Sequence, residues 1–247
     1  MTDPFQPLVD TLDAWRRQGR VARFWLRDDD AVEPTPALDR LLELGAKHRV
    51  PLALAVIPAH AKPSLAEYLA ERPDVNVVLH GWSHENHAPS DQKKQELGAH
   101  RPAEVVLGQL AEGHARLYQM FGGRYTPILV PPWNRIDKTL LPELPAIGLS
   151  GLSVFGAEKP GPLTTINTHA DIMDWHSTRG CRPAADIVAD IVKRLGEMDG
   201  DRQSMGLLTH HLVHDEAAWA FIHALFAATS GHPACRWTAL SALLAEA

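Results

Sequence analysis

The chain has few cysteines, fewer basic than acidic residues, and no long apolar segment. Its 247 residues include two cysteines, Cys181 and Cys235, which are too few for a disulfide scaffold or for a zinc site built from cysteines. There are 24 Lys and Arg against 30 Asp and Glu, so the formal net charge is −6. Proteins that bind nucleic acid through its phosphates are normally basic, so we expect no nucleic-acid partner.

We also expect neither a membrane-spanning helix nor a signal peptide. No apolar run approaches the roughly 18 residues that indicate a membrane-spanning helix. The first five residues have neither the basic flank nor the apolar core of a signal peptide. We therefore expect no membrane partner and a cytoplasmic enzyme.

Short apolar segments alternate with helical patterns along the chain. This alternation predicts an α/β fold with a mostly parallel sheet, either closed as a barrel or open. No linker or internal repeat divides the sequence, so we expect a single domain over residues 1–247. The candidate strands are 21–26, 52–57, 75–79, 127–130, 149–155, 171–175 and 205–208.

Histidine is the residue type present in unusual number, with 14 copies, and several of them lie with acidic or aromatic residues at strand ends. The carboxyl ends of parallel strands lie at one edge of a sheet, where α/β proteins place functional groups. We therefore expect five polar clusters to meet at that edge. The clusters are residues 28–30, 80–84, 131–134, 174–175 and 210–211.

Asp28, Asp29 and Asp30 follow the first candidate strand. Adjacent carboxylates raise one another's pKa unless a cation neutralises them, which a divalent metal ion does. A carboxylate beside such an ion can also act as a general base. Because successive strand residues point to opposite faces, we expect Asp28 and Asp29 to differ in role. The alternative is a solvated acidic turn.

Three histidines, His80, His84 and His87, lie within eight residues. Two histidines four residues apart can reach one metal ion if the backbone turns between them, and Gly81 favours a turn. The helical HExxH pattern of zinc proteases is absent. The alternative is a polar loop without a metal, but the acidic cluster favours a metal site.

The remaining clusters contain candidate catalytic and substrate-binding groups. A carboxylate that holds an imidazole raises its pKa, so Asp174 and His210 are candidates for a paired general acid, although a structural role is commoner for a lone histidine. Prolines make residues 131–134 a rigid loop, and its tryptophan is either a wall for a sugar ring or a core residue. The candidate substrate-binding residues are Pro132, Trp133, Asn134 and Trp175.

In their order along the chain, the five clusters resemble the motifs of the polysaccharide deacetylase family, the NodB homology domain. The family's motifs are Thr-Phe-Asp-Asp-Gly, His-Ser/Thr-x-x-His, Arg-Pro-Pro-Tyr/Trp-Gly, Asp-Trp and Leu-x-His. The matching segments are 26–30, 80–84, 130–134, 174–175 and 208–210. The resemblance covers about residues 21–215 and implies an irregular, incomplete (β/α) barrel with about seven parallel strands.

The resemblance also implies a chemistry. The implied activity is that of a metal-dependent amide hydrolase that removes an N-acetyl group from an amino sugar or glycan. The implied partner is a small-molecule or oligosaccharide substrate. The implied catalytic residues are Asp28 as base and His210, oriented by Asp174, as acid. The implied ligands of a divalent metal ion, for which Zn²⁺ is the first choice, are Asp29, His80 and His84.

Several positions depart from the family's pattern. Val130 stands where the third motif has an Arg that supports the base, and Gly81 replaces the Ser or Thr of the second motif. Asp30 replaces the Gly of the first motif, so the register can shift by one. In that case Asp29 is the base and Asp30 the ligand.

The acid, the ligand set and the reaction each allow more than one assignment. His211 can replace His210 as the acid, and His87 is a further candidate ligand. The substrate can be a non-sugar or cyclic amide, or the protein can bind carbohydrate or metal without catalysis. Two histidines and a carboxylate can also hold Fe(II) for oxygen chemistry, which we rank below hydrolysis. The oligomeric state is open.

Overall fold

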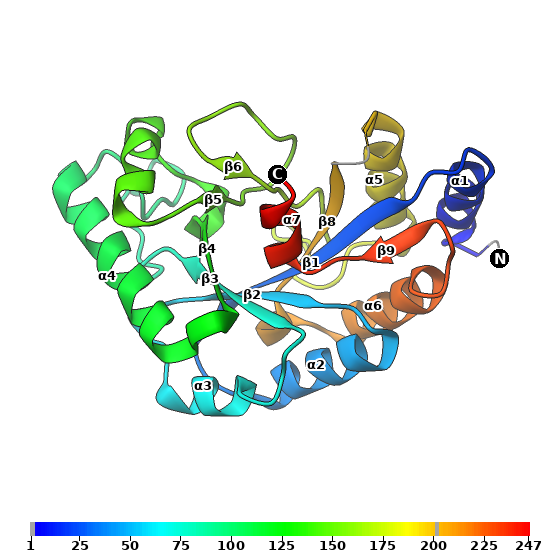
Figure 1. Ribbon diagram of the computed structural model, residues 1–247, viewed down its shortest axis with the longest axis horizontal. Helices are drawn as coiled ribbons and strands as arrows, with labels where there is room; N and C mark the ends of the chain where they lie inside the picture. The colour runs from blue at the N-terminus through cyan, green and yellow to red at the C-terminus, as the bar shows by residue number, and fades with distance from the viewer. Residues whose placement is uncertain (1–2, 201–202) are drawn as a thin grey trace. The chain divides into compact units, whose positions relative to one another are not determined.

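The computed structural model describes residues 3–200 and 203–247, which form an α/β fold (Figure 1). The chain divides into two compact units. The first contains the residues up to 28 together with 35–52 and 168–247, and the second contains 29–34 and 53–167. The chain passes from one unit to the other inside a strand, between Asp28 and Asp29, in the middle of the acidic cluster.

The first unit is built on strand β1 (Ala22–Ala31), which pairs in parallel with β8 (Ser204–Thr209) and with β9 (Cys235–Trp237). β7 (Ala170–Asp171) pairs with β8, also in parallel. Phe24 and Trp25 of β1 are fully buried and contribute to the core of this unit. Its helices are α1 (Gln6–Arg17), α2 (Pro36–His48), α5 (Ala184–Glu197), η4 (His211–Val213), α6 (Glu216–Thr229) and α7 (Leu240–Ala245).

The second unit has a sheet in the order β6-β5-β4-β3-β2, and the hydrogen bond from Ile57 N–H to Ala31 O, 3.1 Å long, adds the end of β1 to it. Its strands are β2 (Leu52–Val56), β3 (Val75–His80), β4 (Tyr125–Val130), β5 (Gly151–Leu152) and β6 (Thr164–Thr165). Its helices are α3 (Pro63–Leu69), α4 (Ala103–Phe121), η1 (Gly122–Arg124), η2 (Pro132–Asn134) and η3 (Lys138–Ile147).

The sheet is open. Its strand order is β6-β5-β4-β3-β2-β1-β8-β7, with β9 beside β1, so among the described residues β6 and β7 are end strands that do not pair with each other. The predicted α/β class with an incomplete barrel of parallel strands is confirmed. The sheet has nine strands instead of about seven, because short strands such as β6 and β9 gave no clear pattern in the sequence.

The single catalytic domain over 1–247 stays a prediction. Among the described residues, no helix has the length and apolar character to cross a membrane.

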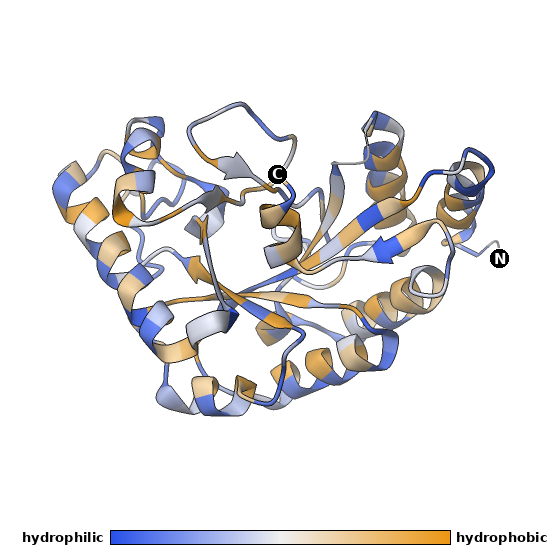
Figure 2. Cartoon of the chain, in the orientation of Figure 1, coloured by the Kyte–Doolittle hydropathy of each residue, from blue (hydrophilic) through white to orange (hydrophobic). Residues whose placement is uncertain are grey.

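Local sequence explains how α2 begins and why the helices bury one face. Thr35 caps α2 by accepting a hydrogen bond from the N–H of Leu38 at 3.1 Å. Figure 2 shows hydrophobic and hydrophilic residues alternating along the helices, as expected for helices with one face toward a core. β1 extends further than predicted, because β8 pairs with it as far as Asp28 and Thr209 and so keeps part of the acidic cluster in the sheet.

Candidate metal centre

The acidic cluster forms the carboxyl end of β1. Asp28 and Asp29 are buried and Asp30 is half-buried. Asp30 has a φ of 76°, a left-handed conformation that few residues other than Gly, Asn and Asp adopt. The regular alternation of strand faces therefore ends at Asp30, and alternation does not predict where its side chain points.

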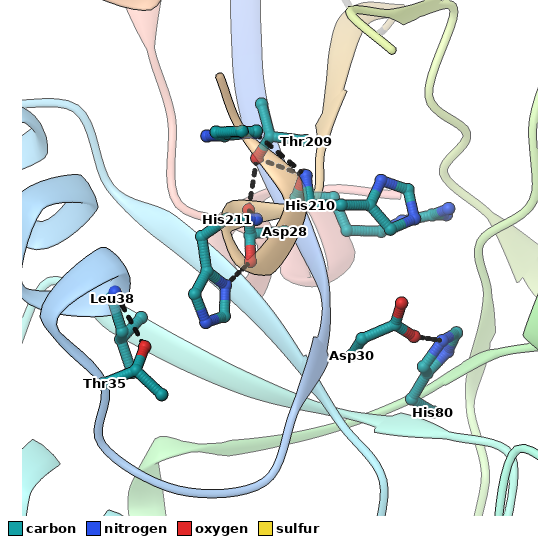
Figure 3. Close-up of polar contacts among 10 residues, drawn as sticks. Asp28, Asp30, Thr35, Leu38, His80, Thr209, His210 and His211 are labelled. Atoms are coloured by element: carbon teal, nitrogen blue, oxygen red, sulfur yellow. Dashed lines mark hydrogen bonds and ion pairs between the residues drawn. The ribbon is translucent and has the colours of Figure 1, made fainter. Parts of the chain in front are cut away.

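Asp30 lies against two histidines of the second unit. Nε2 of His80, the last residue of β3, is 3.0 Å from Oδ1 of Asp30, and Nε2 of His84 is 3.3 Å from the same oxygen. The three ligand atoms all lie within 4.8 Å of one another. Figure 3 shows the contact between Asp30 and His80. Two imidazoles and a carboxylate are a common donor set for a divalent transition metal ion, so these residues fit such an ion.

His80 is held in an orientation that suits a metal ligand. Its Nδ1 donates a hydrogen bond to the carbonyl oxygen of Val130 at 2.9 Å, so Nε2 is the nitrogen that faces Asp30. Metal-binding histidines commonly donate their second ring N–H in this way. Burial lowers the pKa of His80, but the carboxylates of Asp29 and Asp30 raise it, and the net direction is upward. The surroundings of this ring therefore favour positive charge.

The pKa of His84 is shifted in the opposite direction, downward. Burial lowers its pKa, and the charge of His80 lowers it further, against the opposing effects of Asp30 and Glu96. A neutral imidazole is the form that binds metal, so the lowered pKa of His84 suits a ligand. Its backbone is left-handed, with a φ of 60°. Two of the three grouped residues therefore have a backbone conformation that is uncommon for their type.

Glu96 shapes the turn between the two histidines, and sequence reasoning missed it. Its buried carboxylate accepts hydrogen bonds from the backbone N–H groups of Trp82 and Ser83, at 3.2 and 2.7 Å, and from the Ser83 hydroxyl at 3.2 Å. Gly81 has a φ of 57°, and a Cβ there would lie 2.1 Å from Oε2 of Glu96 and 2.6 Å from Pro132. Position 81 therefore requires glycine. Glu96 lies in a long loop without periodicity, so no local pattern identified it.

The third cluster forms the tight turn η2. Trp133 and Asn134 both have left-handed backbones, with φ values of 55° and 57°. A bulky residue keeps this conformation only where the surrounding structure enforces it. The centroid of the Trp133 ring lies 4.4 Å from that of His84. The turn thus holds an aromatic ring against a candidate metal ligand.

In the first unit, Asp28 forms a buried pair with His211. Its Oδ1 contacts Nδ1 of His211, and its Oδ2 accepts hydrogen bonds from the Thr209 hydroxyl at 2.7 Å and from the His211 N–H at 2.9 Å (Figure 3). Burial alone would raise the pKa of Asp28, but the charge and hydrogen bond of His211 outweigh burial and lower it. Both oxygens of this carboxylate are already engaged.

Asp174 and Trp175 lie in a turn after β7 instead of in the expected strand 171–175. The Asp174 carboxylate accepts hydrogen bonds from the backbone N–H groups of the turn that follows it, as far as Thr178. The Trp175 side chain is 40% exposed, and its ring meets that of His210 edge-on, with centroids 4.6 Å apart. His210 thus has Trp175 as its aromatic neighbour, whereas the Asp174 carboxylate accepts hydrogen bonds from the turn that follows it.

The structure groups the predicted residues in two sets, one in each unit. In the second unit Asp30 lies beside His80 and His84. This grouping corresponds to the shifted register of the first motif, in which Asp30 is the ligand and Asp29 the base. Neither Asp29 nor His87 contributes an atom to the group of three ligand atoms. The roles of the individual residues stay predictions.

No family model and no curated protein matches the sequence. Solved structures match its fold. A Mycobacterium smegmatis protein assigned as a polysaccharide deacetylase superposes with a TM-score of 0.69 and 15% identity, over 92% of this chain and 90% of that one. The chain has the fold of the polysaccharide deacetylases. The resemblance expected from the motifs is thus confirmed at the level of the fold.

Two further structures of this deacetylase fold are similar. The family 4 acetyl xylan esterase from Clostridium thermocellum, in complex with a cobalt ion, has a TM-score of 0.56 and 16% identity over 91% of each chain. The peptidoglycan deacetylase PdaC from Bacillus subtilis has a TM-score of 0.57 and 17% identity over 92% of each chain. In this chain Val130, which stands at the position of the third-motif Arg, contacts the site through its backbone carbonyl, which accepts the hydrogen bond from His80.

Proposed function

We propose that the chain is a metal-dependent hydrolase that cleaves an amide bond and removes an N-acetyl group from an amino sugar or glycan. The observation that carries this proposal is the grouping of Asp30, His80 and His84, whose ligand atoms lie within 4.8 Å of one another. The deacetylase fold supports the same class of reaction. The cobalt ion in the Clostridium thermocellum esterase of this fold supports a divalent ion.

In this proposal Asp30, His80 and His84 hold the ion, for which Zn²⁺ is the first choice. A divalent ion of this kind lowers the pKa of a water molecule to about 7 and polarises a carbonyl oxygen. The residues around the ligands fix their positions. The Val130 carbonyl holds the His80 ring, and Glu96 holds the turn between the histidines.

Asp29 is our candidate for the general base. Asp28 is less suited to take a proton, because it is fully buried and its oxygens already contact Thr209 and His211. Asp29 directly precedes the ligand Asp30, and its charge raises the pKa of His80, so it acts electrostatically on a candidate ligand. This assignment shifts the roles implied by the family's motif by one position.

His210 remains our candidate for the general acid. His211 is less suited, because it is buried and its Nδ1 already contacts Asp28. The half-exposed ring of Trp175 lies against His210 and offers a surface on which a sugar can stack. Retention of full activity in His210→Ala would contradict this role.

Metal analysis together with an acetate-release assay tests the proposed function. The wild-type protein is expected to bind a divalent ion and to release acetate from acetylated amino sugars. His80→Ala is expected to lose both properties and to keep its circular dichroism spectrum. The matched control is His100→Ala, because His100 is an exposed histidine outside the group of ligand atoms. Full activity in metal-free His80→Ala would overturn the proposal.

A second candidate function is binding of carbohydrate or metal without catalysis. It is favoured by Val130, which stands where the family has the Arg that supports the base. Binding of an acetylated amino sugar without acetate release, even after addition of Zn²⁺, would select this function. Release of an acyl group from a non-sugar or cyclic amide alone would select a different amide hydrolase.

A further inference from the structure

A cavity of about 380 Å³ lies in the second unit. Pockets that bind small molecules typically measure about 300–1,000 Å³, so this volume suits one part of a small ligand. Its walls come from the chain after Trp133 and from the segment around β5 and β6, and they do not include the three grouped ligand residues. The lining residues used below are Asn134, Arg135, Lys138, Phe155, Lys159 and Asn167.

The charge of this cavity is opposite to that of the whole chain. Arg135, Lys138 and Lys159 line it, and none of its lining residues is Asp or Glu, although the chain has a net charge of −6. Asp137 lies between two of these cations in sequence, but its carboxylate accepts hydrogen bonds from the N–H and hydroxyl of Thr139. The cavity therefore carries a local positive potential that favours an anion.

The cavity walls are held by buried hydrogen bonds. Asn167 is 1% exposed, and its Oδ1 accepts a hydrogen bond from Val154 N–H at 2.9 Å. Its Nδ2 donates to the carbonyl oxygens of Gly156 and Ala157, at 2.8 and 3.2 Å. These bonds fix the segment that carries Phe155, whose side chain is 45% exposed. The cavity thus combines a fixed aromatic surface with cationic groups.

The turn η2 links this cavity to the candidate metal centre. The Trp133 ring packs on His84, and the next residue, Asn134, lines the cavity. Both positions have the left-handed backbone that only a surrounding structure can enforce, so the turn is fixed in its conformation. A ligand that bridges this turn would contact the cavity and the metal centre at once.

We propose that the cavity is a subsite for an anionic group of the substrate, a carboxylate or a phosphate, carried by the same molecule as the acylated amine. This inference rests on the proposed function, because it names the class of substrate that the metal centre would take. Lys138, Lys159 and Arg135 attract the anionic group, and Phe155 packs against an apolar or sugar face. The substrate is therefore an acidic amino-sugar derivative and not a neutral one.

Calorimetric binding tests the subsite without relying on turnover. The probes are neutral N-acetylglucosamine, N-acetylglucosaminyl phosphate and N-acetylmuramic acid, each added to chelator-treated protein. At least one acidic probe is expected to bind about tenfold more tightly than the neutral one, and less tightly as salt is added. A preference for the phosphate or for the carboxylate identifies the anion. Equal binding of all three probes, or no binding of any, would overturn the proposal.

Matched double variants test whether the preference for an acidic probe depends on the lysines of the cavity. Lys138→Gln/Lys159→Gln is expected to lose the preference for the acidic probe, whereas Lys62→Gln/Lys93→Gln, at two exposed lysines outside the cavity, is expected to keep it. The same loss in both double variants would overturn the subsite. The two proposals fail separately: selective binding without acetate release refutes the hydrolase alone, and equal acetate release from acidic and neutral probes refutes the subsite alone.

Discussion

Glu96 lies so close to Gly81 that a Cβ at position 81 would come within 2.1 Å of its Oε2. Gly81 sits between the two candidate histidine ligands, at a φ of 57°. The family's motif has Ser or Thr at this position, so this relationship distinguishes the chain from the family's pattern. Glycine and the buried carboxylate form one arrangement, in which each depends on the other.

Gly81→Ser is expected to destabilise the protein and weaken metal binding. The left-handed backbone alone costs about 1–3 kcal/mol for a residue other than glycine, and the contact with Glu96 adds to that cost. Urea unfolding and metal titration measure the two effects. Gly108→Ser is the matched control, because a Cβ at Gly108 meets nothing within 4 Å. Equal stability of the two variants would contradict the geometry of the turn.

Asp30→Asn and Asp29→Asn are expected to have different effects. Asp30→Asn removes a charged ligand and should lower metal affinity by more than the roughly 10–100-fold that loss of an outer-shell partner costs, whereas Asp29→Asn should keep the metal and lose activity. Metal titration and acetate release, measured on both variants, separate the roles. If Asp29→Asn loses the metal and Asp30→Asn retains it, the unshifted register is correct.

His211→Phe is expected to destabilise the protein by about 3–5 kcal/mol, because the buried Asp28 carboxylate loses the imidazole that balances its charge and keeps only its contacts with the Thr209 hydroxyl and a backbone N–H. The double variant Asp28→Asn/His211→Phe should recover part of the loss, since the uncompensated charge is then gone. Chemical denaturation of both single variants and the double variant gives the coupling energy. A simple sum of the two single effects would show that the pair does not interact.

The free energy of unfolding should fall as the pH falls from about 6.5 to about 4, with His214 contributing to the change. Burial lowers the pKa of His214 from 6.5 to about 4, because it outweighs the charge of Asp28, which raises this pKa. In this pH window the unfolded chain therefore binds more protons than the folded one, so acid favours unfolding. The contribution of His214 to the free energy of unfolding is complete above about pH 6.5 and lost below about pH 4.

His214→Gln tests this contribution, because glutamine does not titrate and can still accept the hydrogen bond that His214 Nε2 receives from His210 N–H. Its loss of stability between pH 7 and pH 5 should be smaller than that of the wild type. His176→Gln, at an exposed position, is the control. Identical pH dependence in wild type and His214→Gln would contradict the pKa assigned to the buried ring.

The sequence by itself determined the α/β class and the segments that carry the polar clusters. Alternating apolar segments and helical patterns encode these features locally, because strand and helix periods depend on neighbouring residues. The pair His80 and His84 was identifiable for the same reason, since both lie in one short segment at the end of β3. The order of the motifs was enough to indicate the deacetylase fold.

Only the tertiary structure decided which acidic residue meets the histidines and which histidine meets Asp28. The left-handed backbone at Asp30 ends the strand alternation, and pairing of β1 with β8 brings Asp28 to Thr209 and His211. Glu96 is likewise placed by a loop without periodicity. These contacts join residues far apart in the chain or depend on a single backbone angle, so no local pattern in the sequence encodes them.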